Sequence, residues 1–239
     1  MEETKDHDRL ERAFTSLTQL RFAEESLDGA MRRIADLAVA VIPACDTCSV
    51  SQVEDKRTLA RVATDDIAEM LDNFQYDNGE GPCMEAIQTA GRFKIESAVD
   101  ERRWPRFTRP AADAGLRSSY SLPLHVDGRV VGALNLYSLA SPFQLNDEQV
   151  SEDFAQHAAV TLANAEAYDR SRKLVANLRI ALESRDVIGQ AKGIIMERER
   201  VTADQAFEVL RSVSQSRNVK LRDLAQQVVD TGTWTYEAT

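Results

Sequence analysis

The sequence predicts an α+β fold, in which a sheet with flanking helices is followed by a long helical region. Three observations support this prediction. Residues 47–63 contain short runs typical of β-strands. Residues 119–138 form two segments with the alternating pattern of β-strands, separated by Asp127-Gly128, a pair favoured in two-residue hairpin turns. From Leu145 onward, apolar residues recur at helical spacing almost to the C-terminus.

The region before the first strand predicts helices. Residues 10–41 carry apolar side chains at helical spacing, which fits two consecutive helices or one helix broken near Asp28-Gly29. Pro43 ends this pattern, because proline cannot continue a helix. Shorter helices are expected at residues 66–74, from Pro82 to a stop at Gly91, and in a segment that ends near Gly115.

The strands are expected to form one sheet with helices packed against it. Residues 47–53 and 58–63 predict an antiparallel pair, with Glu54 and Asp55 available for the turn between them. Residues 93–98 predict a further strand. The hairpin with the Asp-Gly turn completes the sheet.

The composition is that of an ordinary globular protein. Of 239 residues, 43% are hydrophobic and 28% are charged, which fits a medium domain followed by a small one. The first residues are charged, unlike a signal peptide, and no apolar run is long enough to span a membrane. Three cysteines are too few for a disulfide framework, so free thiols and a cytoplasmic location are expected.

The charge is distributed unevenly along the chain. The formal net charge is −10, which argues against a broad nucleic-acid-binding surface, because phosphates repel acidic surfaces. Residues 1–169 carry −13 of this charge and residues 170–239 carry +3. The C-terminal part is therefore compatible with a few placed contacts to nucleic acid.

The helical region that follows the sheet predicts a coiled-coil seam. The residues of this seam follow one another at alternating spacings of four and three: Val150, Phe154, His157, Thr161, Asn164, Tyr168, Ser171, Val175, Leu178 and Leu182. Up to about Thr161 the helix can simply cover the sheet. Beyond that point, packing against a second copy of the chain is expected, which predicts a homodimer. The polar centre of the seam suggests a marginally stable element that could act as a switch.

Residues 188–210, IGQAKGIIMERERVTADQAFEVL, contain no histidine or cysteine. In the first helix of this stretch Ile188, Ala191, Ile195 and Met196 are expected to line the buried face. Gly193 departs from this pattern, because glycine inside a helix costs about 1 kcal/mol relative to alanine. We interpret it as a position where another molecule or segment must approach closely.

Two further helices are expected after this stretch. Thr202 and Gln205 have the spacing of a capping box, which begins the second helix. Asn218 is expected to end it in a left-handed conformation, and Thr231-Gly232 to end the third. The buried faces of these helices are expected to consist of Ala206, Leu210, Val213, Leu221, Leu224, Ala225 and Val228.

The run AKGIIM followed by VTADQAFEVLRSVSQSRNVKLRDLAQQVV resembles the ANTAR domain of bacterial antitermination regulators, over about residues 184–229. The resemblance implies a small helical module that binds paired RNA hairpins in nascent transcripts and prevents a terminator from forming. Phe207 stands where that family often has tyrosine. The implied RNA-binding residues are Ala191, Lys192, Gly193, Met196, Phe207, Arg211, Asn218 and Lys220. Among them Lys192 and Arg211 are favoured, whereas the spacing of Met196 and Phe207 favours packing.

Residues from about 17 to 167 resemble a GAF domain, a sensor domain with a mixed sheet and flanking helices. The resemblance depends on GEGPCMEAI and on SLPLHVDGRVVGALNLYS, two strands joined by a turn. It implies a domain that binds a cyclic nucleotide, a tetrapyrrole, haem or a small metabolite, or that binds no ligand at all; the sequence does not reveal which, and no cofactor is identified. The expected organisation is a sensor over residues 1–166, a helical connector over 167–183 and an ANTAR domain over 184–239.

No catalytic or metal site is expected. The three histidines His7, His125 and His157 are isolated, and none forms a triad with a serine in the sequence. Cys45 and Cys48 lack the further ligands of a tetrahedral metal site, so we interpret them as buried structural residues. Cys83 is expected at a helix N-terminus, where its pKa could be lowered.

The predicted function is a signal-responsive, dimeric antitermination regulator that binds tandem RNA hairpins and does not act as an enzyme. One alternative is a ligand sensor whose helical tail docks a protein partner, such as a kinase or an anti-sigma factor, without nucleic acid. A weaker alternative is a cyclic-nucleotide-regulated enzyme subunit.

Overall fold

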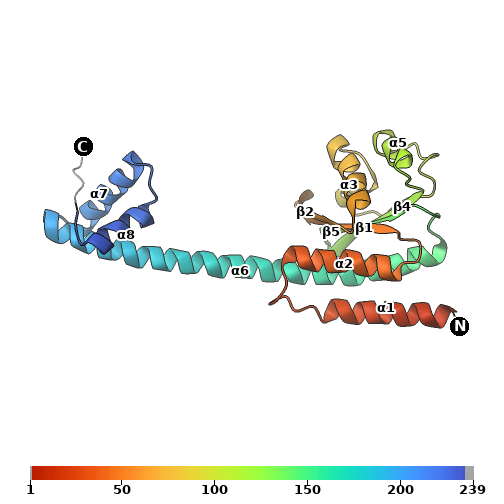
Figure 1. The fold of residues 1–239 in the computed structure, drawn as a ribbon, viewed down its shortest axis with the longest axis horizontal. Helices are drawn as coiled ribbons and strands as arrows, with labels where there is room; N and C mark the ends of the chain where they lie inside the picture. Colours follow the sequence, from red (N-terminus) through yellow and green to blue (C-terminus); the bar gives the residue numbers. More distant parts are fainter. Residues whose placement is uncertain (1, 235–239) are drawn as a thin grey trace. The chain divides into compact units, whose positions relative to one another are not determined.

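The computed structural model describes residues 2–234, with side chains described from residue 9 onward. The chain divides into two compact units, residues 1–169 and 170–239. Helix α6 (Leu145–Glu199) contributes residues to both units (Figure 1). No helix within the described part of the chain is both long and apolar enough to cross a membrane.

The N-terminal unit is built on a five-stranded antiparallel sheet of order β2-β1-β5-β4-β3. The strands are β1 (Thr47–Glu54), β2 (Arg57–Ala63), β3 (Phe93–Ile95), β4 (Ser118–Val126) and β5 (Arg129–Ser138). Helices cover both faces of this sheet, so the predicted α+β fold is confirmed. The strand expected at residues 93–98 is shorter than predicted, since only Phe93, Lys94 and Ile95 pair with β4.

The helices separate into two layers around the sheet (Figure 1). One face is covered by α2 (Leu27–Val41) and the first part of α6, with α1 (Glu2–Thr18) packed beside α2. The other face is covered by α3 (Asp66–Asn78), α4 (Pro82–Thr89) and α5 (Pro105–Asp113). Strands β1, β4 and β5 therefore bury side chains in both directions, in accordance with the two-residue period of a strand, whereas the edge strand β2 has no fully buried side chain.

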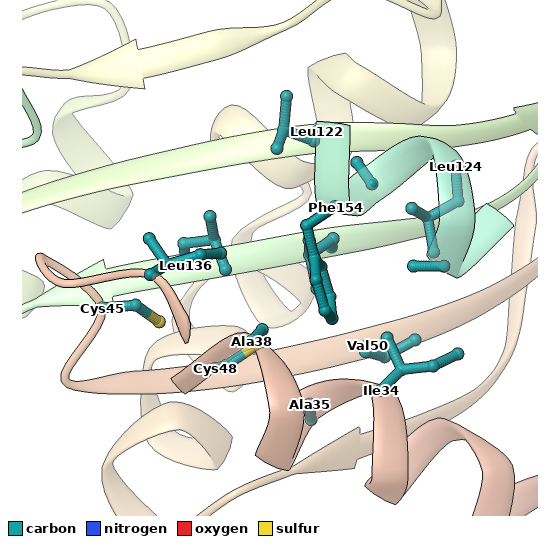
Figure 2. Packing of buried hydrophobic residues seen from close by; sticks show 14 of the residues in the cluster. Ile34, Ala35, Ala38, Cys45, Cys48, Val50, Leu122, Leu124, Leu136 and Phe154 are labelled. Atoms are coloured by element: carbon teal, nitrogen blue, oxygen red, sulfur yellow. The ribbon is translucent and has the colours of Figure 1, made fainter. Parts of the chain in front are cut away.

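The first of these layers forms the larger apolar core. Figure 2 shows Phe154 of α6 among Ile34 of α2, Val50 of β1 and Leu122 of β4. All four side chains are almost fully buried. This packing positions the beginning of α6 firmly against the sheet, because close-packed interiors tolerate little displacement.

The two hairpins have the turn geometry that short connections favour. Asp127 and Gly128 both have positive φ, 52° and 75°, as a type I′ turn requires, so the predicted hairpin is confirmed. In the first hairpin the positive φ values belong to Asp55 and Lys56, 48° and 62°. The expected turn at Glu54 and Asp55 is therefore wrong by one residue, because Glu54 still pairs with Arg57 in the sheet.

Two helix boundaries in the N-terminal unit also differ from expectation. Helices α1 and α2 are separated at residues 19–26, not near Asp28-Gly29, because the hydroxyl of Ser26 accepts a hydrogen bond from the Gly29 amide and begins α2 there. Helix α4 ends at Thr89, and its C-cap Ala90 is left-handed with φ of 57°, so the helix stops just before the expected position at Gly91. Two consecutive helices, one of the predicted alternatives, are confirmed.

The C-terminal unit contains the end of α6 followed by α7 (Ala203–Ser216) and α8 (Leu221–Thr231). The predicted capping box is confirmed, since the Thr202 hydroxyl accepts from the Gln205 amide and the Gln205 side chain accepts from the Thr202 amide. Asn218 and Gly232 both have left-handed conformations, φ of 52° and 62°, and end their helices as expected.

The middle of α6 exposes its apolar side chains. The first part of the predicted seam is covered, with Phe154 and Thr161 buried in the N-terminal unit. Farther along, each of the large apolar side chains is between 49% and 62% exposed: Leu174, Val175, Leu178, Ile180 and Leu182. We call this set the exposed apolar segment of α6. The single chain leaves these side chains in water.

Candidate functional site

The C-terminal unit has a small apolar core. Ala191 and Ile195 of α6 meet Ala206 and Leu210 of α7, all fully buried. The buried side chains of α8 are Leu224, Ala225 and Val228. This core holds the three helices together, so the polar side chains on their outer faces have defined positions.

Two cations and one aromatic ring lie on one surface of this unit. The ammonium of Lys192, on α6, lies 5.8 Å from the centre of the Phe207 ring, on α7. Arg211 follows Phe207 by one helical turn, which puts both on the same face of α7. Arg211 donates a hydrogen bond to Glu208 over 2.5 Å and remains exposed. Lys192 therefore lies near the half-buried ring of Phe207, and Arg211 lies one turn farther along the same face of α7.

The exposed side of α6 lacks side-chain bulk at two glycines. A Cβ atom added to Gly193 would meet nothing within 4 Å, and the same is true of Gly189 one turn earlier. The described chain therefore does not itself make the close approach that Gly193 suggested. Met196 lies on the surface with 36% exposure, so its expected place on the buried face is wrong; Ala191 and Ile195 fill that face instead.

The remaining predicted RNA-binding residues are not gathered at this surface. Ala191 is fully buried, which leaves its side chain unavailable for contact and corrects its inclusion in the set. Asn218 and Lys220 lie in the turn between α7 and α8 and are exposed. This turn is about 15 Å along α7 from Phe207, at 1.5 Å for each residue. The structure brings Lys192 of α6 near Phe207 of α7, while Gly193 and Met196 lie beside Lys192 on α6 and Arg211 lies one turn after Phe207 on α7.

A second polar site lies inside the N-terminal unit, between the sheet and α3. Asp72 of α3 is fully buried, and its Oδ1 accepts hydrogen bonds from Tyr137 over 2.6 Å and from Ser49 over 2.8 Å. The Asn135 amide lies 3.4 Å from the same oxygen. Gln75 donates to the Tyr137 hydroxyl over 3.0 Å. Burial raises the pKa of Asp72 to about 6, although these hydrogen bonds act in the opposite direction.

Several polar atoms of this interior have no hydrogen-bond partner among the residues that the structure describes. They are the second carboxylate oxygen of Asp72, the amide oxygen of Asn135 and the hydroxyls of Ser119 and Ser121. Ser49, Asn135 and Ser121 stand in register across β1, β5 and β4. Buried polar atoms without partners are uncommon, so this row has spare capacity to bind polar groups.

An open cavity of about 730 Å³ adjoins this interior between β2 and α3. Asp72 and Tyr76 form part of its wall, and the Arg61 guanidinium lies 4.3 Å from the centre of the Tyr76 ring. The other charged residues of its wall are Arg32, Asp65, Asp66 and Glu69. Such a lining suits a small polar ligand better than an apolar one.

The cysteines are all free and buried. Cys83 lies in the first turn of α4, yet burial raises its pKa to about 12, so the lowered pKa considered from the sequence is wrong. Desolvation outweighs the helix N-terminus here. Cys45 and Cys48 belong to the apolar core around α2. Within the described residues, no group of three or more histidine, cysteine, aspartate or glutamate side chains could hold a metal ion.

Sequence reasoning missed the polar interior entirely. A signal was present, since Ala68, Leu71, Asp72 and Gln75 share one helical face and all four are buried. Polar residues among the buried positions of an amphipathic helix indicate an internal polar network. Serine at alternate positions of β1 and β4 was a second signal of the same kind.

The sequence matches two family models. Residues 24–163 match the GAF domain family and residues 176–229 match the ANTAR domain family. The chain is a GAF–ANTAR protein. No curated protein matches this GAF–ANTAR chain. ANTAR domains are RNA-binding antitermination domains and GAF domains are signal-sensing domains, so both parts of the protein are of regulatory rather than catalytic types.

Solved structures resemble the GAF–ANTAR protein in its fold. The GAF domain of an Acinetobacter phosphoenolpyruvate-protein phosphotransferase is 15% identical, with a TM-score of 0.50, over 67% of this chain and 93% of that one. Reduced fRMsr of Staphylococcus aureus is 13% identical, with a TM-score of 0.50, over 66% and 94%. The bacteriophytochrome RpBphP3 of R. palustris is 13% identical, with a TM-score of 0.51, over 79% and 42%. At these identities the similarity establishes the GAF fold alone.

Proposed function

We propose that this GAF–ANTAR protein is a signal-responsive antitermination regulator whose ANTAR domain binds tandem RNA hairpins. The observation that supports this most strongly is the joint surface of Lys192, Phe207 and Arg211. Sequence-specific RNA recognition uses splayed loop bases, which stack on aromatic rings and receive hydrogen bonds from nearby cations. A half-buried ring near Lys192, with Arg211 one turn farther along α7, provides these groups on the surface of the helical core.

The residues of this surface have separate roles in the proposal. Lys192 and Arg211 contact phosphates or base edges, and a loop base stacks on the ring of Phe207. Gly193 and Met196 let the RNA approach the α6 backbone, because the space beside Gly193 is open. Asn218 and Lys220 lie at the far end of α7, so they contact the stem rather than the loop.

The proposed active form is a homodimer joined through the exposed apolar segment of α6. Apolar side chains at coiled-coil spacing are unfavourable in water and are buried when two such helices pair. A dimer carries two ANTAR domains, and binding of the second hairpin of a tandem pair becomes intramolecular, which raises the overall affinity. This explains why the RNA target would contain two hairpins.

The proposed signal is a small polar molecule bound by the GAF domain at the Asp72 interior and its adjoining cavity. The domain organisation in this proposal is a sensor over residues 1–166, a helical connector over 167–183 and the ANTAR domain over 184–239. The connector is the switch, because the polar seam residues Tyr168 and Ser171 within it, and Asn164 just before it, limit its stability. Action on nascent transcripts implies a cytoplasmic location, where the three free thiols would stay reduced.

RNA binding by the full chain tests the proposal. We expect the protein to bind an RNA with two tandem hairpins at least tenfold more tightly than an RNA with one, and not to bind duplex DNA of the same length at the same salt concentration. Lys192→Ala and Arg211→Ala should each weaken binding, whereas Arg222→Ala, an exposed arginine on α8, should not. A folded dimer that binds none of these RNAs would contradict the proposal and favour docking of a protein partner.

A further inference from the structure

A second cavity in the GAF domain lies on the opposite face of the sheet from Asp72. It has a volume of about 550 Å³ and lies between β4 and α6. The cavity exists because β3 pairs with β4 only as far as Ser121. The rest of β4, from Leu122 to Val126, extends beyond the end of β3, and the space beside it is not filled by another strand.

The wall of this cavity is mainly apolar. Strand β4 contributes Leu122, Pro123 and Val126, and helix α6 contributes Ala155, Ala159 and Val160. Val160 is 52% exposed, although it is a large apolar side chain in a well-packed part of the helix. Ligand pockets typically have volumes of about 300–1,000 Å³ and combine apolar walls with a few polar groups. The cavity agrees with that description, unlike the charged cavity beside α3.

Arg92, at the rim of the cavity, has hydrogen-bond donors that are not used within the described part of the chain, whereas its partner Glu152 has no free oxygen. Glu152 of α6 accepts a hydrogen bond from the Tyr120 hydroxyl over 2.7 Å through one oxygen and pairs with Arg92 through the other. Both of its oxygens are therefore engaged. Arg92 is 57% exposed and has five N–H donors, of which the ion pair uses only part. The rim therefore favours an anion over a cation.

We propose that this cavity binds a small carboxylic acid with an apolar body. The carboxylate pairs with the free donors of Arg92, and the apolar body lies between β4 and α6. An inorganic anion would leave the apolar wall in water, and a neutral hydrocarbon would not use Arg92. A monocarboxylate of medium length satisfies both parts of the site.

Such a ligand would act directly on α6. This helix contributes Glu152 to the rim and Ala155, Ala159 and Val160 to the wall. A bound apolar body would bury Val160 and add contacts between α6 and the sheet, which would stabilise this part of the helix against separation from β4. The inference does not depend on RNA binding, because every residue involved belongs to the GAF domain.

Titration of the full chain with octanoate tests the site, with 1-octanol as a neutral probe of similar length. Binding is measured by calorimetry and by chemical-shift changes of valine methyl groups, including Val160. We expect octanoate to bind the wild-type protein, and Arg92→Gln to weaken octanoate binding at least tenfold while leaving octanol binding unchanged. Arg109→Gln, a change at an exposed arginine on α5, is the matched control and should have no effect.

A second variant separates this site from an interface between copies of the chain. Val160→Trp should fill the mouth of the cavity and weaken both octanoate and octanol binding, and the exposure of Val160 allows the protein to fold. The proposal is overturned if folded wild-type protein does not bind octanoate, or if Arg92→Gln binds it as tightly as wild type. It is also overturned if Val160→Trp changes the oligomeric state and leaves octanoate binding intact.

Discussion

The ammonium of Lys192 and the ring of Phe207 lie 5.8 Å apart and connect α6 to α7 on the surface of the ANTAR domain. A cation at this distance from an aromatic face is stabilised by about 0.5–1 kcal/mol at an exposed site. The contact is too weak to hold the domain together, which its apolar core already does. Its consequence is to hold a cation and a ring next to each other on the surface.

The ring of Phe207 should matter for RNA binding more than for folding. We expect Phe207→Tyr to keep the affinity for tandem-hairpin RNA within about threefold, and Phe207→Leu to weaken it about tenfold, because stacking on an aromatic side chain contributes about 1–3 kcal/mol for each base. Fluorescence anisotropy with a labelled RNA measures the affinity. Equal affinity of the leucine and tyrosine variants would show that the ring only packs.

The two surface glycines of α6 provide a matched pair of variants. Alanine at either position has room for its Cβ and should stabilise the helix by about 0.5–1 kcal/mol, measured by thermal unfolding. If RNA approaches the helix at Gly193, Gly193→Ala should weaken RNA binding despite this gain, and Gly189→Ala should weaken it less. The interpretation of Gly193 fails if its variant binds RNA as well as wild type.

The exposed apolar segment of α6 should determine the oligomeric state. Leu178 is 55% exposed in the single chain, so Leu178→Glu should leave each unit folded but place two charges in the paired helices and shift the protein to monomer. Leu59→Glu, at a leucine of β2 with 56% exposure, is the control and should leave the dimer unchanged. Sedimentation velocity distinguishes the two variants. Dimerisation of Leu178→Glu at wild-type concentrations would rule out this interface.

Buried Asp72 should make the stability of the GAF domain depend on pH. Its pKa is about 6 in the folded protein, against an ordinary value of 3.8, so the folded state holds the proton more tightly than the unfolded state. The contribution of Asp72 to stability is therefore greatest below about pH 4 and falls as the pH rises to about 6, by up to about 3 kcal/mol. Asp72→Asn should remove this fall.

Urea unfolding followed by tryptophan fluorescence measures this effect. Trp104 reports on the GAF domain, and a Trp234→Phe background removes the tryptophan of the ANTAR core. Asp77→Asn, at an exposed aspartate on the same helix, is the control and should keep the pH dependence of the wild type. An unchanged pH dependence in Asp72→Asn would mean that Asp72 titrates normally.

The salt dependence of RNA binding should be modest for an RNA-binding protein. The cations of the C-terminal unit are largely offset by acidic residues, so that residues 170–239 carry a net charge of only +3, and the whole chain carries −10. Lys192→Gln should reduce the slope of log affinity against log salt by about one for each ANTAR domain, because one phosphate contact is lost. An unchanged slope would place Lys192 outside the phosphate contacts.

Patterns carried by neighbouring residues were enough to predict most of the elements. The Asp127-Gly128 turn, the capping box at Thr202 and the left-handed Asn218 depend on a few consecutive side chains and their own backbone, so they are readable without the fold. Two errors concerned the exact positions of a helix end and a turn. Ala90 and Lys56 adopt left-handed conformations that their residue types do not signal, because the surrounding elements impose them.

The amino-acid order thus determined the fold class and the two families, and it named Lys192, Phe207 and Arg211 as candidates for the ANTAR surface. It did not reveal which of those residues meet. Lys192 and Phe207 are far apart in the sequence, and Met196 and Ala191 are equally apolar, so their separation into surface and core depends on how α7 packs on α6. The Asp72 network and the cavity beside Val160 depend likewise on strands and helices distant along the chain, because burial and hydrogen bonding are properties of neighbours in space.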